Sequence, residues 1–357
     1  MRPLIATINL DNLRHNFRYL KQQHKNKLYA VVKADAYGHG AIPCSTALQN
    51  DADGLAVAFL DEAIELRKNG IKLPIVLLEG VFEFAEYEIC DKLNISCVVQ
   101  NQTQLEWLLN YQWKNKTQVW LKLDTGMRRA GFFPADYEKA FHVLSQFTPI
   151  NDIVKMTHFA CADDLSSAMT QQQIQTFDET TQNLIGKSSI ANSAAILAHP
   201  TTHRDIGRAG IALYGVSPFE ENNKLANQLK PVMTLTTKVF GERILRKGES
   251  VGYGSIFRAE KDMRLGLIAC GYADGYPRVP SNNNPILIDG EPSRIVGRVS
   301  MDMMTIELKL QQQGIGSTVE LWGENILVAD IARRCGTISY EVLCHLKRAI
   351  RQYKNSI

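Results

Sequence analysis

The sequence has no long run of apolar residues and no excess of charge of one sign. Its 40 lysine and arginine residues nearly balance its 37 aspartate and glutamate residues, which leaves a formal net charge of +3. This balance, without a basic run, gives no reason to expect a nucleic-acid or membrane-surface partner. No apolar run approaches the length of a bilayer, and the first residues do not resemble a signal peptide. We therefore expect a cytoplasmic protein that acts on a small molecule.

The sequence also lacks the residue patterns of metal and redox sites. Its seven cysteines are odd in number and scattered, with none of the close pairs that bind zinc or exchange disulfides. His199 and His203 have the spacing of metal ligands, but Pro200 disfavours a continuous helix between them, and no third ligand is evident. We expect reduced thiols and no metal site.

With 357 residues, the chain exceeds the usual size of one hydrophobic core, which favours a large domain and a smaller one. From about Leu28 to Gly215, short apolar segments alternate with longer segments of helical periodicity. We predict eight strands, at residues 28–33, 55–59, 74–78, 95–99, 118–123, 152–158, 188–191 and, weakly, 203–206. Eight such units indicate an α/β fold with a TIM-type (β/α)8 barrel, although a doubly wound sheet would give a similar local pattern.

The pattern changes after Asn227 to an alternation of apolar and polar residues, as in MTLTTKVFGERIL. Turn signals such as Asp289-Gly290 separate short strands, and two helical segments follow. The sequence therefore predicts the barrel over residues 1–228 and a C-terminal, mainly β domain over residues 229–357. The N-terminal segment LIATINL could pair with either domain.

Polar residues occupy the ends of several predicted barrel strands, where the active sites of such barrels lie. Lys33 ends the first strand, Lys122 lies near the end of the fifth, and His158 ends the sixth. Alone, each lysine is more often a solvated cap and the histidine a packed barrel residue. Their coincidence favours a functional site.

A second feature indicates a phosphate. Asn192 and Ser193 open a helix after the seventh strand, and free N–H groups at such a position can bind an anion. A plain helix cap is the commoner explanation. However, Gly207-Arg208-Ala209-Gly210-Ile211 follows, and loops after strands seven and eight usually hold phosphate in such barrels. A phosphate site together with an imine-forming lysine favours pyridoxal 5'-phosphate (PLP) as the cofactor.

Nine motifs follow one another along essentially the whole chain: AVVKADAYGHG, LKLDTGMRRAGF, THFA, NSAA, RAGIALYG, VGYGSIF, GYADGYPR, GRVSMD and ISYE. In this order they resemble the alanine racemase family of barrel-fold PLP enzymes. The resemblance implies an isomerase that interconverts L-alanine and D-alanine, either to supply D-alanine for peptidoglycan or to serve alanine catabolism. It also implies a homodimer with shared active sites.

The resemblance implies a catalytic pair and a phosphate cradle. Lys33 would hold PLP covalently and act as the base on the D side. Tyr272, contributed by the partner subunit, would act on the L side, because racemisation needs a proton to leave one face of Cα and another to reach the opposite face. The residues that would hold or border the phosphate are Tyr37, Asn192, Ser193, Gly210, Ile211 and Tyr340.

The resemblance also assigns residues around the cofactor ring. Arg208 would face the pyridine nitrogen, with His158 bonded to it. Because a guanidinium does not readily release a proton, the ring nitrogen would stay unprotonated, which suppresses side reactions such as transamination. Arg129 would contact the cofactor phenolate oxygen and the substrate carboxylate. Lys122 aligns with a lysine that is carbamylated in many family members.

On the partner side, Met301 and Asp302 would border the substrate, and Tyr253 would narrow the entrance. The chain departs from the family pattern at Arg128, which adds a cation near the expected carboxylate site, and at Ala209.

A barrel-fold decarboxylase should lack the GYADGYPR and GRVSMD motifs, and a PLP-carrier protein should end near residue 230. A racemase with broader or serine-preferring specificity stays open, because the entrance residues decide the pocket size.

Overall fold

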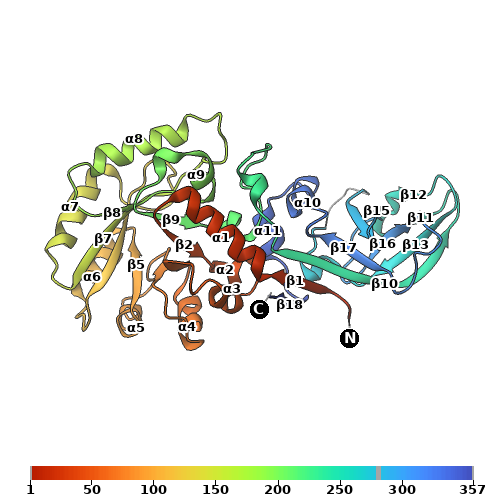
Figure 1. The fold of residues 1–357 in the computed structure, drawn as a ribbon, viewed down its shortest axis with the longest axis horizontal. Helices are drawn as coiled ribbons and strands as arrows, with labels where there is room; N and C mark the ends of the chain where they lie inside the picture. The colour runs from red at the N-terminus through yellow and green to blue at the C-terminus, as the bar shows by residue number, and fades with distance from the viewer. Residues whose placement is uncertain (1, 279–282, 356–357) are drawn as a thin grey trace.

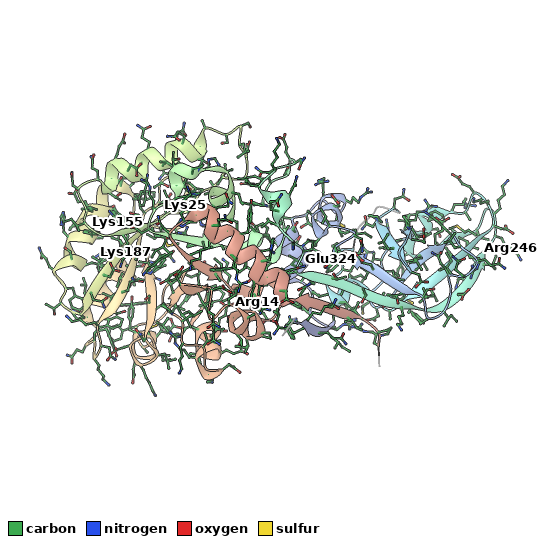
Figure 2. All side chains as sticks on the ribbon, in the orientation of Figure 1. Arg14, Lys25, Lys155, Lys187, Arg246 and Glu324 are labelled. Carbon is green, nitrogen blue, oxygen red and sulfur yellow. The ribbon has the colours of Figure 1, made fainter. Side chains whose placement is uncertain are left out.

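The computed structural model describes residues 2–278 and 283–355. The chain forms two parts along the long axis of the molecule, with the barrel at one end and an antiparallel sheet at the other (Figure 1). Charged side chains are spread over both parts, as the labelled Arg14, Lys187 and Arg246 illustrate (Figure 2). No described helix is long and apolar enough to span a membrane.

The barrel is a parallel sheet of eight strands with the order β8-β7-β6-β5-β4-β3-β2-β9 among the described residues. Its strands are β2 (Lys27–Val31), β3 (Gly54–Val57), β4 (Ile75–Leu77), β5 (Ile95–Val99), β6 (Thr117–Lys122), β7 (Ile150–Met156), β8 (Lys187–Ser189) and β9 (Ile206–Ala209). The predicted (β/α)8 barrel is therefore confirmed, as is the mainly β second part described below.

Helices connect these strands. They are α1 (Leu10–His24), α2 (Lys33–Tyr37), α3 (Ala41–Ala47), α4 (Leu60–Lys68), α5 (Glu86–Leu93), α6 (Gln102–Asn110), α7 (Pro134–Gln146), α8 (Met169–Thr181) and α9 (Ser193–Ala198). Short 3-10 turns η1 (Pro200–Thr202), η2 (Ile211–Tyr214) and η3 (Ala226–Gln228) follow. The longer helices lie on the outside of the barrel (Figure 1).

Helix α1 illustrates how local sequence sets these elements. The Asn9 side chain accepts hydrogen bonds from the N–H groups of Asp11 and Asn12, each at 3.1 Å, and so caps the first turn. Leu13, Phe17 and Leu20 recur at helical spacing and are buried. This apolar stripe packs the helix onto the barrel wall.

Several details of the barrel differ from the sequence prediction. The eighth strand is Ile206–Ala209 rather than 203–206, because its residues IGRA include a glycine and a buried arginine and so do not give an apolar pattern. The first strand ends at Val31, and Lys33 begins α2 instead of ending the strand. Lys33 therefore lies on the segment that follows its strand, whereas Arg208 lies within β9. His158 was predicted to end the sixth strand, but it lies two residues beyond the end of β7 at Met156.

The second part is built mainly from antiparallel strands. Its elements are β1 (Ile5–Asn9), β10 (Met233–Leu245), β11 (Ser250–Val251), η4 (Tyr253–Ser255), β12 (Phe257–Arg258), β13 (Met263–Ile268), η5 (Tyr272–Asp274), β14 (Pro285–Ile288), β15 (Glu291–Val296), β16 (Met304–Leu308), β17 (Thr318–Trp322), α10 (Val328–Arg334), α11 (Ser339–Cys344) and β18 (Ile350–Lys354). Strand β10 pairs with both β17 and β13, which closes the sheet on itself. The N-terminal strand β1 joins this sheet, between β10 and β18.

Candidate active site at the barrel mouth

Lys33 begins a turn with an unusual backbone. The four residues that follow it, Ala34, Asp35, Ala36 and Tyr37, all have φ between 52° and 54°, in the left-handed region. For residues with a Cβ atom, this conformation costs roughly 1–2 kcal/mol each. Strain of this kind persists only where the surrounding structure enforces it, and it is concentrated at functional sites.

Two carboxylates hold the strained turn. Glu62 accepts a hydrogen bond from the N–H of Ala34 at 2.6 Å. Asp35 accepts one from the N–H of Ala41 at 2.7 Å and forms an ion pair with Arg351 at 2.5 Å. The position of Lys33 is therefore fixed by contacts to α4, α3 and β18. Glu62 could not be predicted as a residue of the site, because Ala34, which it anchors, lies 28 positions away in the sequence.

Two hydroxyl groups and a glycine backbone converge near the start of η2. The Ser193 Oγ accepts hydrogen bonds from the N–H groups of Gly210 at 2.9 Å and Ala212 at 3.3 Å. A Cβ atom on Gly210 would lie 3.1 Å from the Tyr37 Oη and 3.6 Å from the Ser193 Oγ. Because its oxygen accepts both bonds, the Ser193 hydroxyl can donate its proton elsewhere. Two hydroxyl donors beside a space that a glycine leaves open fit a phosphate group.

The tyrosines of this cradle keep their protons at neutral pH. Burial raises the pKa of Tyr37, and it raises the pKa of Tyr340 to about 12. Tyr340, on α11, lies beside Tyr37 with the ring centroids 5.9 Å apart. Asn192 has a different role from the tyrosines. Its side chain accepts a hydrogen bond from the N–H of Ala195 at 3.0 Å and so caps α9. Ile211 follows Gly210 as the first residue of η2.

Arg208 lies inside the barrel and is almost fully buried. Its guanidinium donates to the Ser189 backbone oxygen at 2.7 Å, to the Ser189 Oγ at 2.6 Å and to the Thr157 backbone oxygen at 2.7 Å. Burial lowers the pKa of Arg208 to about 10, so it is still a cation at neutral pH. Neither Ser189 nor Thr157 was predicted as a site residue; Ser189 ends the observed strand β8, and Thr157 follows the last residue of β7.

His158 lies against this cation. Its Nδ1 is 3.5 Å from the Arg208 guanidinium. Burial, and then the charge of Arg208, lower the pKa of His158 well below its usual value, so the ring is neutral. Since a guanidinium can only donate, Nδ1 is the acceptor and the proton belongs on Nε2.

Lys122, at the end of β6, shares a small cavity with Arg129 and His158. The pKa of Lys122 is lowered to about 8, mainly by burial. The charge of Glu79 raises this pKa and the charge of nearby Arg129 lowers it. A part of the population therefore has a neutral, nucleophilic amine near neutral pH. Arg128 does not share this cavity, and its guanidinium stacks on the Phe133 ring at 5.3 Å from the centroid.

Tyr272 belongs to the second part of the molecule and is partly exposed. Its N–H donates to the Ser300 backbone oxygen at 3.0 Å. A Cβ atom on Gly271 would lie 2.3 Å from the backbone oxygens of both Ser300 and Met301. The GYADGYPR and GRVSMD motifs are therefore in direct backbone contact. Asp302, at the end of the second motif, forms an ion pair with Arg348.

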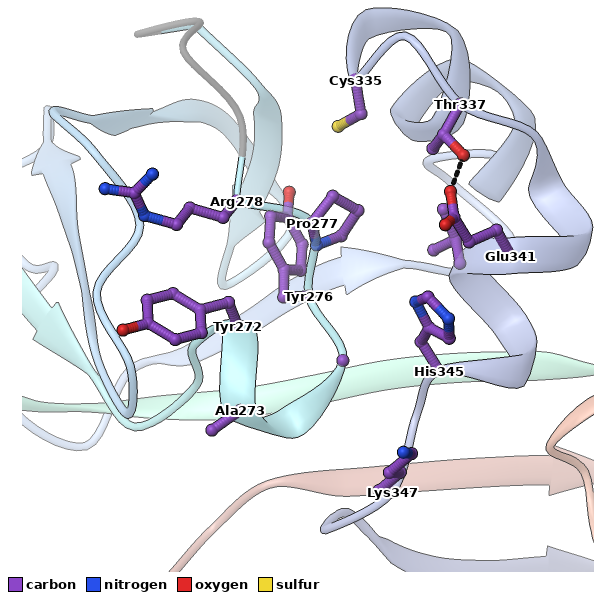
Figure 3. A pocket seen from close by; sticks show the side chains of 12 residues that line it. Tyr272, Ala273, Tyr276, Pro277, Arg278, Cys335, Thr337, Glu341, His345 and Lys347 are labelled. Carbon is purple, nitrogen blue, oxygen red and sulfur yellow. Dashed lines mark hydrogen bonds between the residues drawn. The ribbon is translucent and has the colours of Figure 1, made fainter.

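A cavity of about 550 Å³ lies beside Tyr272. Arg278 lies alongside the Tyr272 ring, 5.9 Å from its centroid, while Glu341 and His345 line the opposite side (Figure 3). Met301 and Tyr253 are also exposed, at 53% and 66%. No hydrogen bond, ion pair or ring contact between described residues joins Tyr272, Met301 or Tyr253 to Lys33 or to the cradle at Gly210.

Comparisons with known proteins agree along the whole chain. Residues 8–218 match the family model "Alanine racemase, N-terminal domain", and residues 232–353 match "Alanine racemase, C-terminal domain". A curated alanine racemase of Neisseria gonorrhoeae is 54% identical over 349 residues, 98% of each chain. A catabolic alanine racemase of Pseudomonas aeruginosa is 46% identical and covers 100% of both chains.

Solved structures lead to the same family. The crystal structure of a biosynthetic alanine racemase from Pseudomonas aeruginosa has a TM-score of 0.96 and 42% identity, covering 99% of this chain and 100% of that one. The structure of alanine racemase from Acinetobacter baumannii has a TM-score of 0.93 and 38% identity, covering 99% and 100%. The chain belongs to the alanine racemase family of PLP-dependent isomerases.

Proposed function

We propose that this chain interconverts L-alanine and D-alanine with PLP bound to Lys33. The observation that supports this most directly is the convergence of three features at one barrel mouth: Lys33 on its strained turn, the donor cradle at Gly210 and the buried cation of Arg208. PLP, when bound, supplies an electron-withdrawing ring that stabilises negative charge at the substrate Cα. The remaining tasks fall to side chains of the protein.

The phosphate of PLP would be bound by hydroxyl and N–H groups. Tyr37, Tyr340 and Ser193 would donate from their hydroxyls, and Ile211 would donate from its backbone. The Gly210 N–H would exchange its bond to the Ser193 Oγ for one to the phosphate. The raised tyrosine pKa values support this role, because a protonated phenol can donate to an anion. Asn192 would act by capping α9 and so positioning Ser193.

Arg208 would face the ring nitrogen of PLP and leave it unprotonated. Its contacts to Ser189 and Thr157 fix the guanidinium, and neutral His158 accepts from it. A cation that cannot readily release its proton limits how far negative charge spreads into the ring. The charge would then stay near Cα, where fast reprotonation gives racemisation.

Lys33 and Tyr272 would be the two bases, one on each face of Cα. Lys33 would move the proton on the D side at its Nζ, and the Tyr272 hydroxyl would move it on the L side. Among the described residues of one chain, no hydrogen bond, ion pair or ring contact joins Tyr272 to the barrel mouth, and its side chain is exposed. We therefore propose a homodimer in which Tyr272 and its neighbours in the region 229–357 of one subunit complete the site that residues 1–228 and Tyr340 of the other build.

The substrate carboxylate would be bound by Arg129, with Met301 and Asp302 bordering it from the partner side. Lys122 would position Arg129 after carbamylation, in which the neutral amine forms a bond to the carbon of carbon dioxide, a proton is released to solvent and a negatively charged carbamate remains. The lowered pKa of Lys122 supports this proposal, because it provides the neutral amine. Tyr253 would narrow the entrance to substrates the size of alanine.

The test uses the full chain, purified and supplied with PLP. L-alanine is added, and D-alanine is followed with a stereospecific oxidase, with Lys33→Ala as the control. The proposal requires D-alanine in the wild type and none in the variant. If D-serine forms from L-serine as fast as D-alanine forms from L-alanine, the specificity is broader. If no amino acid is racemised while PLP is bound, the proposed activity is wrong.

A further inference from the structure

Gln173, on α8, is a polar residue that is 0% exposed. Its amide oxygen and both of its N–H groups have partners. The Oε1 accepts from the N–H of Ala160 at 2.9 Å, and the Nε2 donates to the His158 backbone oxygen and to the Thr125 Oγ1, each at 3.0 Å. Packing of the helix alone would favour an apolar side chain, because an amide is costly to bury unless its groups are bonded. The three bonds indicate that Gln173 links other segments to α8.

Two of these bonds hold the segment that follows β7. The His158 oxygen and the Ala160 N–H bind to the same amide, so the backbone on either side of Phe159 is fixed to α8. The His158 Nδ1 lies 3.5 Å from the Arg208 guanidinium. Gln173 therefore fixes the backbone from which the imidazole approaches the buried cation.

The third bond begins a directed chain of hydroxyl groups. Thr125 accepts from Gln173, and its Oγ1 lies 2.8 Å from the Thr157 Oγ1. The Thr157 hydroxyl donates its one proton to the Leu123 backbone oxygen at 2.9 Å, so Thr125 is the donor between the two hydroxyls. The Thr157 backbone oxygen in turn accepts from Arg208. The segments after β6 and β7 are thus joined to each other as well as to α8.

The segment after β6 is stiffened by its own bonds, so an anchor at its start also positions Arg129. The Asp124 Oδ1 accepts from the N–H of Gly126 at 2.8 Å and from the N–H of Arg128 at 3.1 Å. A Cβ atom on Gly126 would lie 3.4 Å from the Gln173 Cγ. This turn therefore packs directly against the side chain that anchors it.

We propose that Gln173 is a positioning residue that holds Arg129 and His158 in place relative to each other. Residues of both anchored segments line the small cavity that Arg129, His158 and Lys122 share. The inference rests on the proposed function, since Arg129 is the residue that would bind the substrate carboxylate. Without the link, the two segments could separate, and Arg129 would meet the carboxylate less well. The phosphate cradle at Gly210 is built from other segments and would be unaffected.

The test measures the binding of propanoate, which has the carboxylate and the methyl group of alanine but no amine. It can bind at the carboxylate site and cannot be racemised, so its dissociation constant describes the site without turnover. The full chain is loaded with PLP, and propanoate is added while the absorbance of the bound cofactor is followed. A separate titration of the unloaded chain gives the affinity for PLP.

Gln173→Met keeps the length of the side chain and removes all three hydrogen bonds. We expect it to weaken propanoate binding at least ~10-fold, because a hydrogen bond to a charged group is typically worth that much and Arg129 would no longer be held in place. Its affinity for PLP should change less than about twofold, since the cradle at Gly210 is independent of this link.

Two variants of α8 serve as controls. Gln171→Met makes the same substitution at an exposed position of the helix and should leave propanoate binding unchanged. Ile174→Ala removes buried apolar contacts of the helix and leaves the Gln173 amide in place. It should lower the midpoint of urea unfolding but keep propanoate binding within about twofold of the wild type, because a cavity in the core destabilises the fold without cutting the link.

A second pair of variants tests the hydroxyl chain and does not require Gln173→Met to fold. Thr125→Val keeps the shape of the side chain and removes the hydroxyl, so it should weaken propanoate binding at least ~5-fold. Thr125→Ser keeps the hydroxyl and should bind propanoate within about twofold of the wild type.

Two results would overturn the inference. One is an equal affinity for propanoate in the wild type, Gln173→Met and Thr125→Val. The other is a loss in Ile174→Ala as large as that in Gln173→Met, since the affinity would then follow the stability of α8. Failure of the proposed function gives a different result: the wild type would bind PLP and propanoate but form no D-alanine, and the variants would still decide the role of Gln173.

Discussion

Replacing Lys122 with methionine should stabilise the protein, and the gain should depend on pH. Folding lowers the pKa of Lys122 from 10.5 to about 8, mainly by burial. Each pKa unit corresponds to about 1.36 kcal/mol, so the buried ammonium costs about 3 kcal/mol at pH 7. Methionine has a similar shape and no charge to bury. Lys122→Met should therefore raise the free energy of unfolding at pH 7 by up to about 3 kcal/mol.

The direction of the pH dependence follows from the lowered pKa. Between pH 8 and pH 10.5 the unfolded chain binds the lysine proton and the folded chain does not, so wild-type stability rises with pH in this window. The advantage of Lys122→Met should fall to about 1.4 kcal/mol at pH 9.5.

Urea unfolding of both proteins without PLP, at pH 7 and pH 9.5 in buffer freed of bicarbonate, measures this difference. The buried-ammonium explanation is refuted if the difference between variant and wild type is the same at both pH values. Adding bicarbonate provides a second comparison. It should stabilise the wild type and leave Lys122→Met unchanged if Lys122 forms a carbamate.

Three further predictions concern other parts of the site. Gly210→Ala should lower PLP affinity at least ~10-fold, because its Cβ would enter the cradle 3.1 Å from the Tyr37 Oη. Affinity is measured from the cofactor absorbance, and the midpoint of urea unfolding should stay unchanged; equal losses of affinity and stability would contradict this. Ala34→Gly should cost almost nothing in urea unfolding, since it relieves a positive φ, whereas Ala140→Gly in the middle of α7 should cost at least about 1 kcal/mol. Equal costs would refute the strain. Tyr272→Phe should slow racemisation at least ~100-fold without loss of bound PLP, and a wild-type rate in both directions would exclude Tyr272 as a base.

The architecture was predictable because it is encoded in short-range patterns. Apolar strands alternating with amphipathic helices identify the barrel, and a change of period near Asn227 identifies the antiparallel sheet. The resemblance of nine motifs to one family then gave candidate residues, of which Lys33, Ser193, Arg208 and Gly210 lie near the ends of barrel strands. These are the positions at which polar residues in a barrel meet.

The parts that were not predictable depend on contacts between distant segments. The left-handed turn after Lys33 has no signature in ADAY, since none of these residues is a glycine. Its anchors, Glu62 and Arg351, come from elements far apart in the sequence. Likewise, LIATINL has the pattern of a strand, but only the folded chain shows that it pairs with β10 and β18.

Arg208 contributes to the closure of the barrel in addition to its proposed role at PLP, and the sequence pattern does not distinguish these two roles. Strands β8 and β9 stand at opposite ends of the order in the parallel sheet, and no ladder between them is recorded for the described residues. Arg208 spans this opening: its N–H donates to the Ala191 oxygen at 3.0 Å, and its guanidinium donates twice to Ser189. Because these bonds close the barrel, they also hold the guanidinium still at the proposed PLP site. The residue that we propose to tune the cofactor is thus positioned by the same contacts that complete the fold. Backbone and hydroxyl oxygens take the place of a carboxylate, since Arg208 has no ion pair among the described residues.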